Sequence, residues 1–262
     1  MSIAGAWKNE YGSTMILTIV GNTITGTYKS STGSTGEYRV SGYQVGRDAT
    51  VAVGQPIALA IEWHSVVGGP SDPSWNWTSG LSGQISIFDG EEVLVLSHMM
   101  IASTDFPDLS TTGNYIDKLT YRRALAPDHA ARKVDAEKYM PVVDPLNGKW
   151  ITVGGSILNL RVSTDIENKI GYVTGSIDSS DGSFEIVGFT DINAWSNALS
   201  LQSIAICAAK PSVTEVLSLS GTLNLATRRL HLVSMNSLAT ASKNSYAQTR
   251  ISSMSFRHSL SF

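Results

Sequence analysis

The amino-acid sequence predicts an all-β protein made of two similar halves. Short segments that alternate apolar and polar residues recur along the chain, separated by turn-forming residues. Charged residues make up only 16% of the 262 residues, below the roughly 25% of an average soluble protein, which suits strands and turns better than exposed helices. Motifs of the first half also return, in the same order, in the second.

The strand-like segments can be placed in order. Residues 14–28 alternate on both sides of a Gly-Asn pair at positions 21 and 22, which predicts a β-hairpin. Many short strands with regular turns between them are typical of a sandwich or a barrel. Further segments of this kind lie at 37–45, 56–63, 81–88, 92–102 and 114–122.

Residues 124–145 interrupt this pattern with charge, alanine and three prolines at positions 127, 141 and 145. We expect this segment to be a linker, with a short exposed helix over 130–140 that the prolines bound. The predicted domains are therefore residues 1–123 and 146–262.

After the linker the chain repeats itself. Trp150, followed by Gly-Ser at 155–156, matches Trp7, followed by Gly-Ser at 12–13. Thr-Gly pairs follow at 25–26 and 174–175, and Leu-Ser-Gly occurs at 81–83 and 219–221. Three matches in the same order predict an internal duplication.

Composition excludes several classes of function. The net charge of −3 provides no basic face for nucleic acid. Cys207 stands among apolar residues and is expected to be a buried small side chain. No histidine pair has metal-ligand spacing, so we expect no metal, and neither a secretory signal nor an apolar run of about 20 residues is present. The expected location is cytoplasmic.

At these motifs the chain resembles the avidin and streptavidin family. Residues 5–13 are similar to the first strand and turn of that family, and residues 26–30 to its Gly-Thr-Tyr-x-Ser strand. Trp63 ends a segment similar to an apolar strand of the family, and residues 82–84 match its Ser-Gly-Gln run; residues 246–257 resemble its last strand. The resemblance implies two consecutive eight-stranded antiparallel up-and-down β-barrels, each open at one end, of a type that holds biotin.

The resemblance also implies roles for residues of the first half. Asn9, Ser13 and Tyr28 would donate to the ureido oxygen of biotin, and three fixed donors around one oxygen polarise it. Ser30 and Asp117 would accept the ureido N–H groups, and residues 31–36 would form the loop that closes the mouth. With Ser79 near the sulfur, Trp63 as an aromatic wall and Met99 at a further wall position, the expected ligand-binding set is Asn9, Ser13, Tyr28, Ser30, Trp63, Ser79, Met99 and Asp117. No cofactor is expected; biotin is the possible ligand.

The chain departs from the family pattern at the aromatic walls. Leu81, Met99 and Leu109 stand where three tryptophans are expected, and Trp77 replaces a small polar residue near the ligand carboxylate. Each lost tryptophan would cost about 1–2 kcal/mol of apolar burial. These changes predict either weaker biotin binding or a different ligand.

The second half has lost more of the polar set. Thr152, Ile177 and Met254 are matched to Asn9, Tyr28 and Asp117, while serines persist at 156 and 179. A ureido group buried without partners costs about 1–3 kcal/mol per polar atom. We therefore expect the second barrel to bind no biotin and to act as a structural partner.

Two classes of function follow. The first is a small-molecule binding protein that holds biotin or a biotin-like heterocycle in the amino-terminal barrel. The second is an enzyme on the same scaffold that cyclises or isomerises an apolar carbonyl-containing substrate, with Asp117, His64 or His98 near the donors. A third class of function, which the sequence supports less, is a defence protein that presents loops to partners. We expect no nucleic-acid or membrane partner, and a pair of barrels within the chain, as a monomer or as a homodimer that imitates a tetramer.

Overall fold

The computed structural model describes residues 2–32, 36–67, 72–106, 109, 111–125, 139–165, 169–241 and 249–259. These residues form an all-β protein with two closed antiparallel barrels, together with one 3₁₀ turn, η1 (Pro73–Asn76). The predicted fold class is confirmed. No helix in the described part of the chain is long and apolar enough to cross a membrane.

The first barrel is a closed up-and-down ring in which each strand pairs with the next along the chain. The ring closes where β1 pairs with β8, through Trp7 opposite Arg123. Its strands are β1 (Gly5–Asn9), β2 (Thr14–Val20), β3 (Thr23–Lys29), β4 (Glu37–Gln44), β5 (Gln55–Glu62), β6 (Thr78–Phe88), β7 (Glu91–Ala102) and β8 (Gly113–Arg123).

The second barrel repeats this ring and carries one extra strand. It closes through pairings of β10 with both β11 and β17. Its strands are β10 (Gly148–Thr152), β11 (Ile157–Asp165), β12 (Ile170–Ser179), β13 (Gly182–Thr190), β14 (Leu201–Ala209), β15 (Val216–Asn224), β16 (Arg229–Ser237) and β17 (Thr249–His258).

The extra strand, β9 (Met140–Pro141), pairs with the end of β11. Most of the helix expected over 130–140 lies outside the described residues. Its last residue, Met140, is in a strand instead, since Pro141 cannot continue a helix and Met140 pairs with Thr164.

The two barrels share local geometry at their first strands. The Trp7 indole N–H donates to the Ile3 carbonyl at 2.7 Å, and the Trp150 indole donates to the Leu146 carbonyl at 2.8 Å. Both tryptophans are fully buried, and the glycine two residues before each has φ +116°. This match is what the internal duplication predicts.

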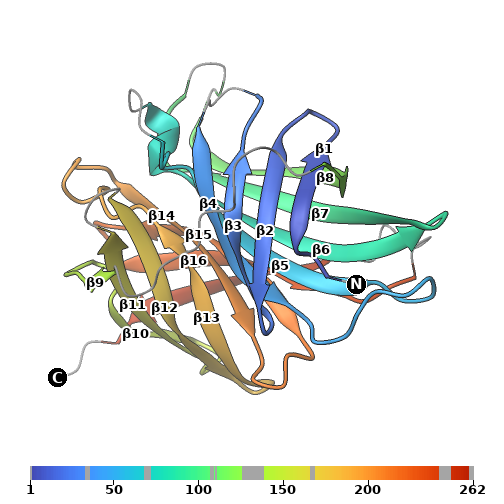
Figure 1. Cartoon of the computed structure of the whole chain (residues 1–262). Helices are drawn as coiled ribbons and strands as arrows, with labels where there is room; N and C mark the ends of the chain where they lie inside the picture. Colours follow the sequence, from blue (N-terminus) through green and yellow to red (C-terminus); the bar gives the residue numbers. More distant parts are fainter. Residues whose placement is uncertain are drawn as a thin grey trace.

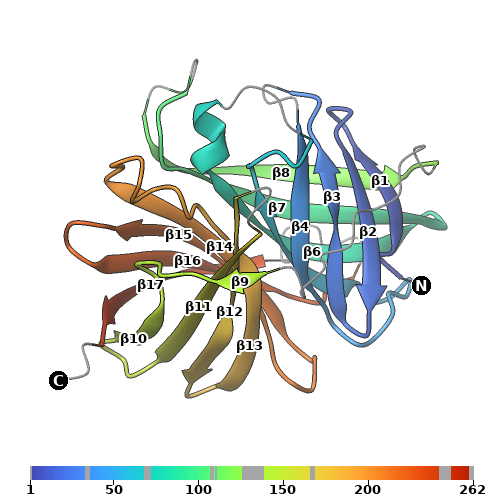
Figure 2. The ribbon, with the colours of Figure 1, turned by 60° about the vertical axis from the view of Figure 1, so that its left-hand side comes forward.

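The barrels lie side by side, with the outer faces of β4–β7 against β13–β16 (Figures 1 and 2). Small side chains allow the sheets to approach closely: Ala58 and Ala60 belong to one apolar cluster with Ala205 and Cys207. Cys207 is buried, as expected. At Gly80 a Cβ atom would overlap the hydroxyls of Ser218 and Ser220 in the second barrel, so a larger residue there would force these side chains to move.

Hydrogen bonds at both ends of the interface show that the barrels are antiparallel to each other. At one end, Ser203 Oγ, where β14 begins, donates to the Asn76 carbonyl in η1 at 2.6 Å. At the other, the Gly54 amide after the β4–β5 turn donates to the Thr240 carbonyl, beyond β16, at 2.9 Å. Between them Ser82 and Ser237 share a hydroxyl–hydroxyl bond of 2.7 Å. The η1 end of the first barrel therefore faces the opposite way from the corresponding end of the second.

Candidate ligand pocket

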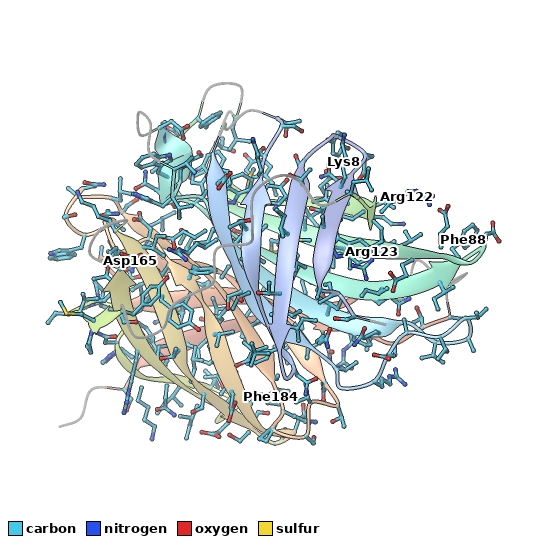
Figure 3. The ribbon with its side chains drawn as sticks, in the orientation of Figure 1. Lys8, Phe88, Arg122, Arg123, Asp165 and Phe184 are labelled. Atoms are coloured by element: carbon cyan, nitrogen blue, oxygen red, sulfur yellow. The ribbon has the colours of Figure 1, made fainter. Side chains whose placement is uncertain are left out.

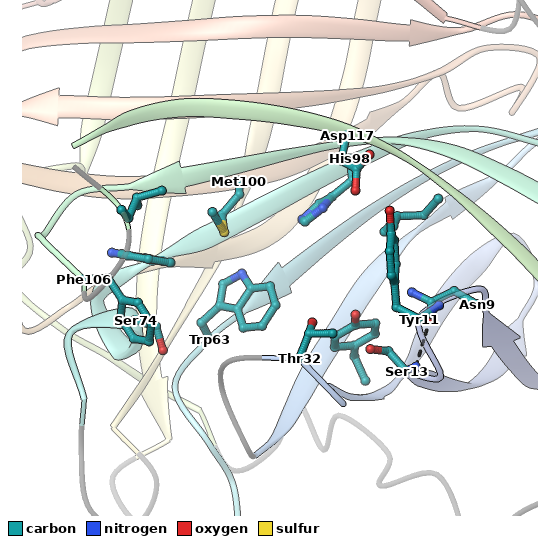
Figure 4. Close-up of a pocket in the computed structure, with 14 residues that line it drawn as sticks. Asn9, Tyr11, Ser13, Thr32, Trp63, Ser74, His98, Met100, Phe106 and Asp117 are labelled. Atoms are coloured by element: carbon teal, nitrogen blue, oxygen red, sulfur yellow. Dashed lines mark hydrogen bonds between the residues drawn. The ribbon is translucent and has the colours of Figure 1, made fainter. Parts of the chain in front are cut away.

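The first barrel is hollow at the end that carries η1, with a cavity of about 460 Å³ (Figure 4). This volume is within the range of 300–1,000 Å³ that is typical of small-molecule sites. The cavity is lined by Asn9, Tyr11, Ser13, Tyr28, Thr32, Trp63, Ser74, Trp77, His98, Met100, Phe106, Leu109, Asp117 and Leu119.

Three buried hydrogen-bonding side chains meet on one side of this cavity. The Asn9 Oδ1 atom accepts the backbone amides of Tyr11 at 3.1 Å and Ser13 at 2.9 Å. Because the oxygen is occupied by its own turn, the amide nitrogen of Asn9 is the atom left to donate to a ligand. The Ser13 hydroxyl accepts the Ser31 amide at 3.1 Å and also lies 3.1 Å from the Ser31 hydroxyl, to which it can donate.

Tyr28 completes the group from β3. Its hydroxyl contacts the side chains of Ser13, Tyr121 and Asn9, and burial raises its pKa above the usual value of 10.0. Tyr28 is therefore a neutral hydrogen-bond donor near pH 7. The predicted trio is brought together in one cavity wall, backed by the fully buried Tyr121, which the sequence analysis did not single out.

Aromatic side chains form the apolar walls. The Trp63 ring packs edge-on against Tyr28, with centroids 5.9 Å apart, and lies 5.0 Å from Tyr38. Trp77 packs against Phe106 at 5.2 Å, and its indole N–H donates to Thr104 Oγ1 at 2.9 Å. Trp77 and Phe106 thus add aromatic area to the pocket.

Hydrogen-bonded polar side chains lie behind the wall that Trp63 forms. The Trp63 indole N–H donates to Ser79 Oγ at 2.8 Å, and His98 Nε2 lies 2.9 Å from the same oxygen. Ser79 is completely buried and is not a lining residue itself. Burial lowers the pKa of His98 to about 4, against a smaller opposing effect of the Asp117 charge, so His98 is neutral at pH 7.

Asp117 lies at the open mouth. It stands opposite His98 in the pairing of β7 with β8, and its Oδ1 atom accepts the Lys118 amide at 2.7 Å. The side chain is exposed and lines the pocket (Figure 4). The site therefore combines donors on one side with a carboxylate acceptor at the rim.

Three of the expected ligand-binding residues do not line the pocket: Ser79, described above, Met99 and Ser30. Met99 packs with Ile101 and Met235 against the second barrel, while its neighbour Met100 faces the cavity. Successive side chains of a strand point to opposite faces, so an error of one residue exchanges inside and outside. Ser30 is buried beside the pocket, and its hydroxyl donates to the Thr32 carbonyl at 2.8 Å.

Other positions also differ from expectation. Leu109, which stands at an expected tryptophan position, lines the pocket and pairs with Phe106. Leu81 is part of the barrel core. His64 packs its ring against Trp75 and is absent from the lining, and residues 33–35 of the expected closing loop lie outside the described residues.

Several lining residues were missed at the sequence level. Met100 could have been found by counting alternate residues from His98 along β7. Tyr11, Thr32, Ser74 and Phe106 lie in turns and loops, where no periodicity predicts the direction of a side chain.

The corresponding end of the second barrel carries different side chains. Cross-strand pairing places Ile177 at the position of Tyr28 and Phe184 at that of Tyr38. Gly42 of β4 pairs with the residue four positions before Trp63. Gly188 of β13 pairs with the residue four positions before Lys210, so Lys210 takes the position of Trp63. Phe184 is buried, and the Lys210 ammonium lies 5.2 Å from its ring centre while it pairs with Glu215 at 2.7 Å (Phe184 is labelled in Figure 3).

The same pairing corrects one sequence match. Asp117 pairs with His98, and its counterpart is Ser252, which pairs with Ser234. Met254 corresponds to Leu119, two residues further along the last strand. The mismatch arose because the last strands of the two halves share little sequence, so only the ladder fixes their register.

A closed β-barrel with an aromatic-walled cavity and convergent donors defines a small-molecule binding protein. Residues 1–108 match the family model of the Avidin family. The amino-terminal barrel is therefore similar to the Avidin family over most of its strands.

Two further comparisons were made with known proteins. A solved structure titled "Crystal structure of Xenavidin" is similar to part of the chain, with 22% identity and a TM-score of 0.37, over 47% of this chain and 97% of that one. No curated protein matches the chain.

Proposed function

We propose that the amino-terminal barrel binds biotin or a biotin-like heterocycle and that the second barrel supports it structurally. The observation that carries the proposal is the convergence of Asn9, Ser13 and Tyr28 on one side of the cavity. Three neutral donors suit a carbonyl oxygen that carries partial negative charge, as in a cyclic urea.

The rest of the pocket suits the rest of such a ligand. The Asp117 carboxylate can accept an N–H group, and Trp63 and Trp77 offer flat apolar surface to a fused ring. Each neutral hydrogen bond contributes about 0.5–1.5 kcal/mol net, so the aromatic walls supply much of the affinity. The second barrel lacks this arrangement because Ile177 has no hydroxyl at the position of Tyr28 and Thr152 has no amide at that of Asn9.

Calorimetric titration with biotin tests the proposal, with a matched pair of variants. Asn9→Ala removes one donor, and Thr152→Ala makes the equivalent change in the second barrel. Each residue also accepts the amide of the serine four positions later, so both variants lose a similar turn contact. We expect one site per chain, about tenfold weaker binding in Asn9→Ala and unchanged binding in Thr152→Ala. Absence of heat and of a thermal shift at millimolar biotin would reject the proposal.

Catalysis is a second candidate, favoured by the neutral His98 that faces Asp117 across the strand pair in the same cavity as the donors. Such a pair could move a proton on a substrate whose carbonyl is polarised. Mass spectrometry of a ligand that copurifies with the protein, before and after prolonged incubation, distinguishes the two: a binding protein returns it unchanged. Assembly of two chains into a four-barrel dimer stays a prediction, which light scattering checks.

A further inference from the structure

Ser79 fixes which nitrogen of His98 carries the proton. An indole N–H can only donate, so Ser79 Oγ accepts from Trp63. The Ser79 hydroxyl is completely buried, and the described partner left for its own proton is His98 Nε2 at 2.9 Å. If Nε2 carried a proton, two donors would point at Ser79 and its hydroxyl proton would be buried without an acceptor, which is unfavourable. The neutral imidazole is therefore protonated on Nδ1.

The protonated nitrogen is open to the cavity. His98 lines the pocket, and Nδ1 makes no hydrogen bond to a described residue. It is also not among the buried polar atoms that lack a partner, so its N–H contacts the pocket space. Ser79 hydrogen-bonds to the side chains of Trp63 and His98 and has no exposed surface, so it is a positioning residue.

We propose that His98 selects the ligand by donating its Nδ1–H to an acceptor on the part of the ligand that faces β7. The inference rests on the proposed function. When the ureido oxygen of a biotin-like ring meets Asn9, Ser13 and Tyr28, the opposite edge of the fused ring points away from them, toward the wall that Trp63 and His98 form (Figure 4). In biotin this edge is a thioether, a weak acceptor; an oxygen there would meet the imidazole donor. The pocket thus favours an oxygenated ring over the plain thioether.

The test compares biotin with biotin sulfoxide, which carries an oxygen on that edge, in four proteins. His98→Leu removes both nitrogens. His98→Asn places an amide near the position of Nδ1, and His98→Gln places one near Nε2, where it can still contact Ser79. We expect the ratio of biotin to sulfoxide dissociation constants to fall about fivefold in His98→Leu and His98→Gln, and to be largely kept in His98→Asn.

The outcomes separate this inference from the proposed function. If biotin binds and the ratio is the same in wild type and His98→Leu, the selection by His98 is overturned while biotin binding stands. If neither compound binds, both proposals fail. Long-range ¹H–¹⁵N spectra of the free wild-type protein provide a readout that needs no ligand: a proton on Nδ1 of His98 supports the inference, and a proton on Nε2 overturns it.

Discussion

Thr152 in the second barrel makes the same backbone contact as Asn9 in the first. Asn9 Oδ1 accepts the Ser13 amide at 2.9 Å, and Thr152 Oγ1 accepts the Ser156 amide at 3.0 Å. The turn after each residue is therefore held in the same way, but threonine has no amide nitrogen to present to a ligand. The structural role of this position has been kept in both barrels, whereas the donor is present in one.

Tyr28→Phe removes a single donor without changing the shape of the wall. Loss of one neutral hydrogen bond to the ligand predicts about tenfold weaker biotin binding by calorimetry. Tyr115→Phe is the control, because the Tyr115 hydroxyl bonds to Thr111 outside the pocket lining. Equal affinity of Tyr28→Phe and wild type would show that the hydroxyl does not contact the ligand.

Phe184→Ala should open a cavity in the second barrel. Truncation of a buried phenylalanine leaves a cavity and costs about 3–5 kcal/mol, measured as the free energy of unfolding in urea. The matched control is Phe88→Ala, whose ring is 52% exposed and whose loss should cost under about 0.5 kcal/mol. Similar losses in the two variants would contradict a packed interior at Phe184.

Gly80→Ala tests the close contact between the barrels. The added methyl would overlap the hydroxyls of Ser218 and Ser220, so we expect a loss of about 1–3 kcal/mol in unfolding free energy. Replacing both serines by alanine in the same chain should restore much of it, since Ser220 Cβ would be 3.2 Å from the new methyl carbon. Gly113→Ala, where the nearest atom is at 3.8 Å, is the control. Failure of the double replacement to rescue Gly80→Ala would argue against this packing.

Asp191 predicts a pH dependence of stability. Burial raises its pKa from 3.8 to about 7, with the Asp144 charge acting in the same direction. The folded protein therefore holds this proton more tightly than the unfolded chain. The resulting stabilisation is complete below pH 4 and is lost as the pH rises to about 7. Between these values the free energy of unfolding falls by about 1.4 kcal/mol for each pH unit.

The variant Asp191→Asn should abolish this dependence. Its free energy of unfolding, measured in urea at each pH, should rise relative to that of wild type as the pH increases from 4 to 8. Asp181→Asn, at an exposed turn, controls for the change in net charge. A constant difference between Asp191→Asn and wild type over this range would contradict the raised pKa.

Strand alternation and the family resemblance predicted the barrels and the donor trio because both depend on local patterns. Met99 was misplaced for a physical reason. Most barrel strands show one apolar and one wet face, but β7 is covered on both, by the cavity at Met100 and by the second barrel at Met99. Residues 99–102 of this strand are all apolar, so the sequence there does not distinguish inside from outside.

Long-range contacts account for the other differences. The contact between Phe184 and Lys210 in the second barrel arises only through the strand pairing. Neither residue type predicts it by itself. The role of His98 likewise follows from Ser79 and Trp63, which lie 19 and 35 positions earlier in the chain and meet it through two strand pairings.

The covalent link between the barrels has a consequence for how the protein behaves on dilution. Ser203 of the second barrel holds the η1 backbone that leads into Trp77, and Met235 packs behind β7, so the partner barrel braces two walls of the cavity. In an assembly of separate chains such bracing disappears once the concentration falls below the dissociation constant. Here the supporting partner is always present, so the site keeps its shape at any concentration of the protein.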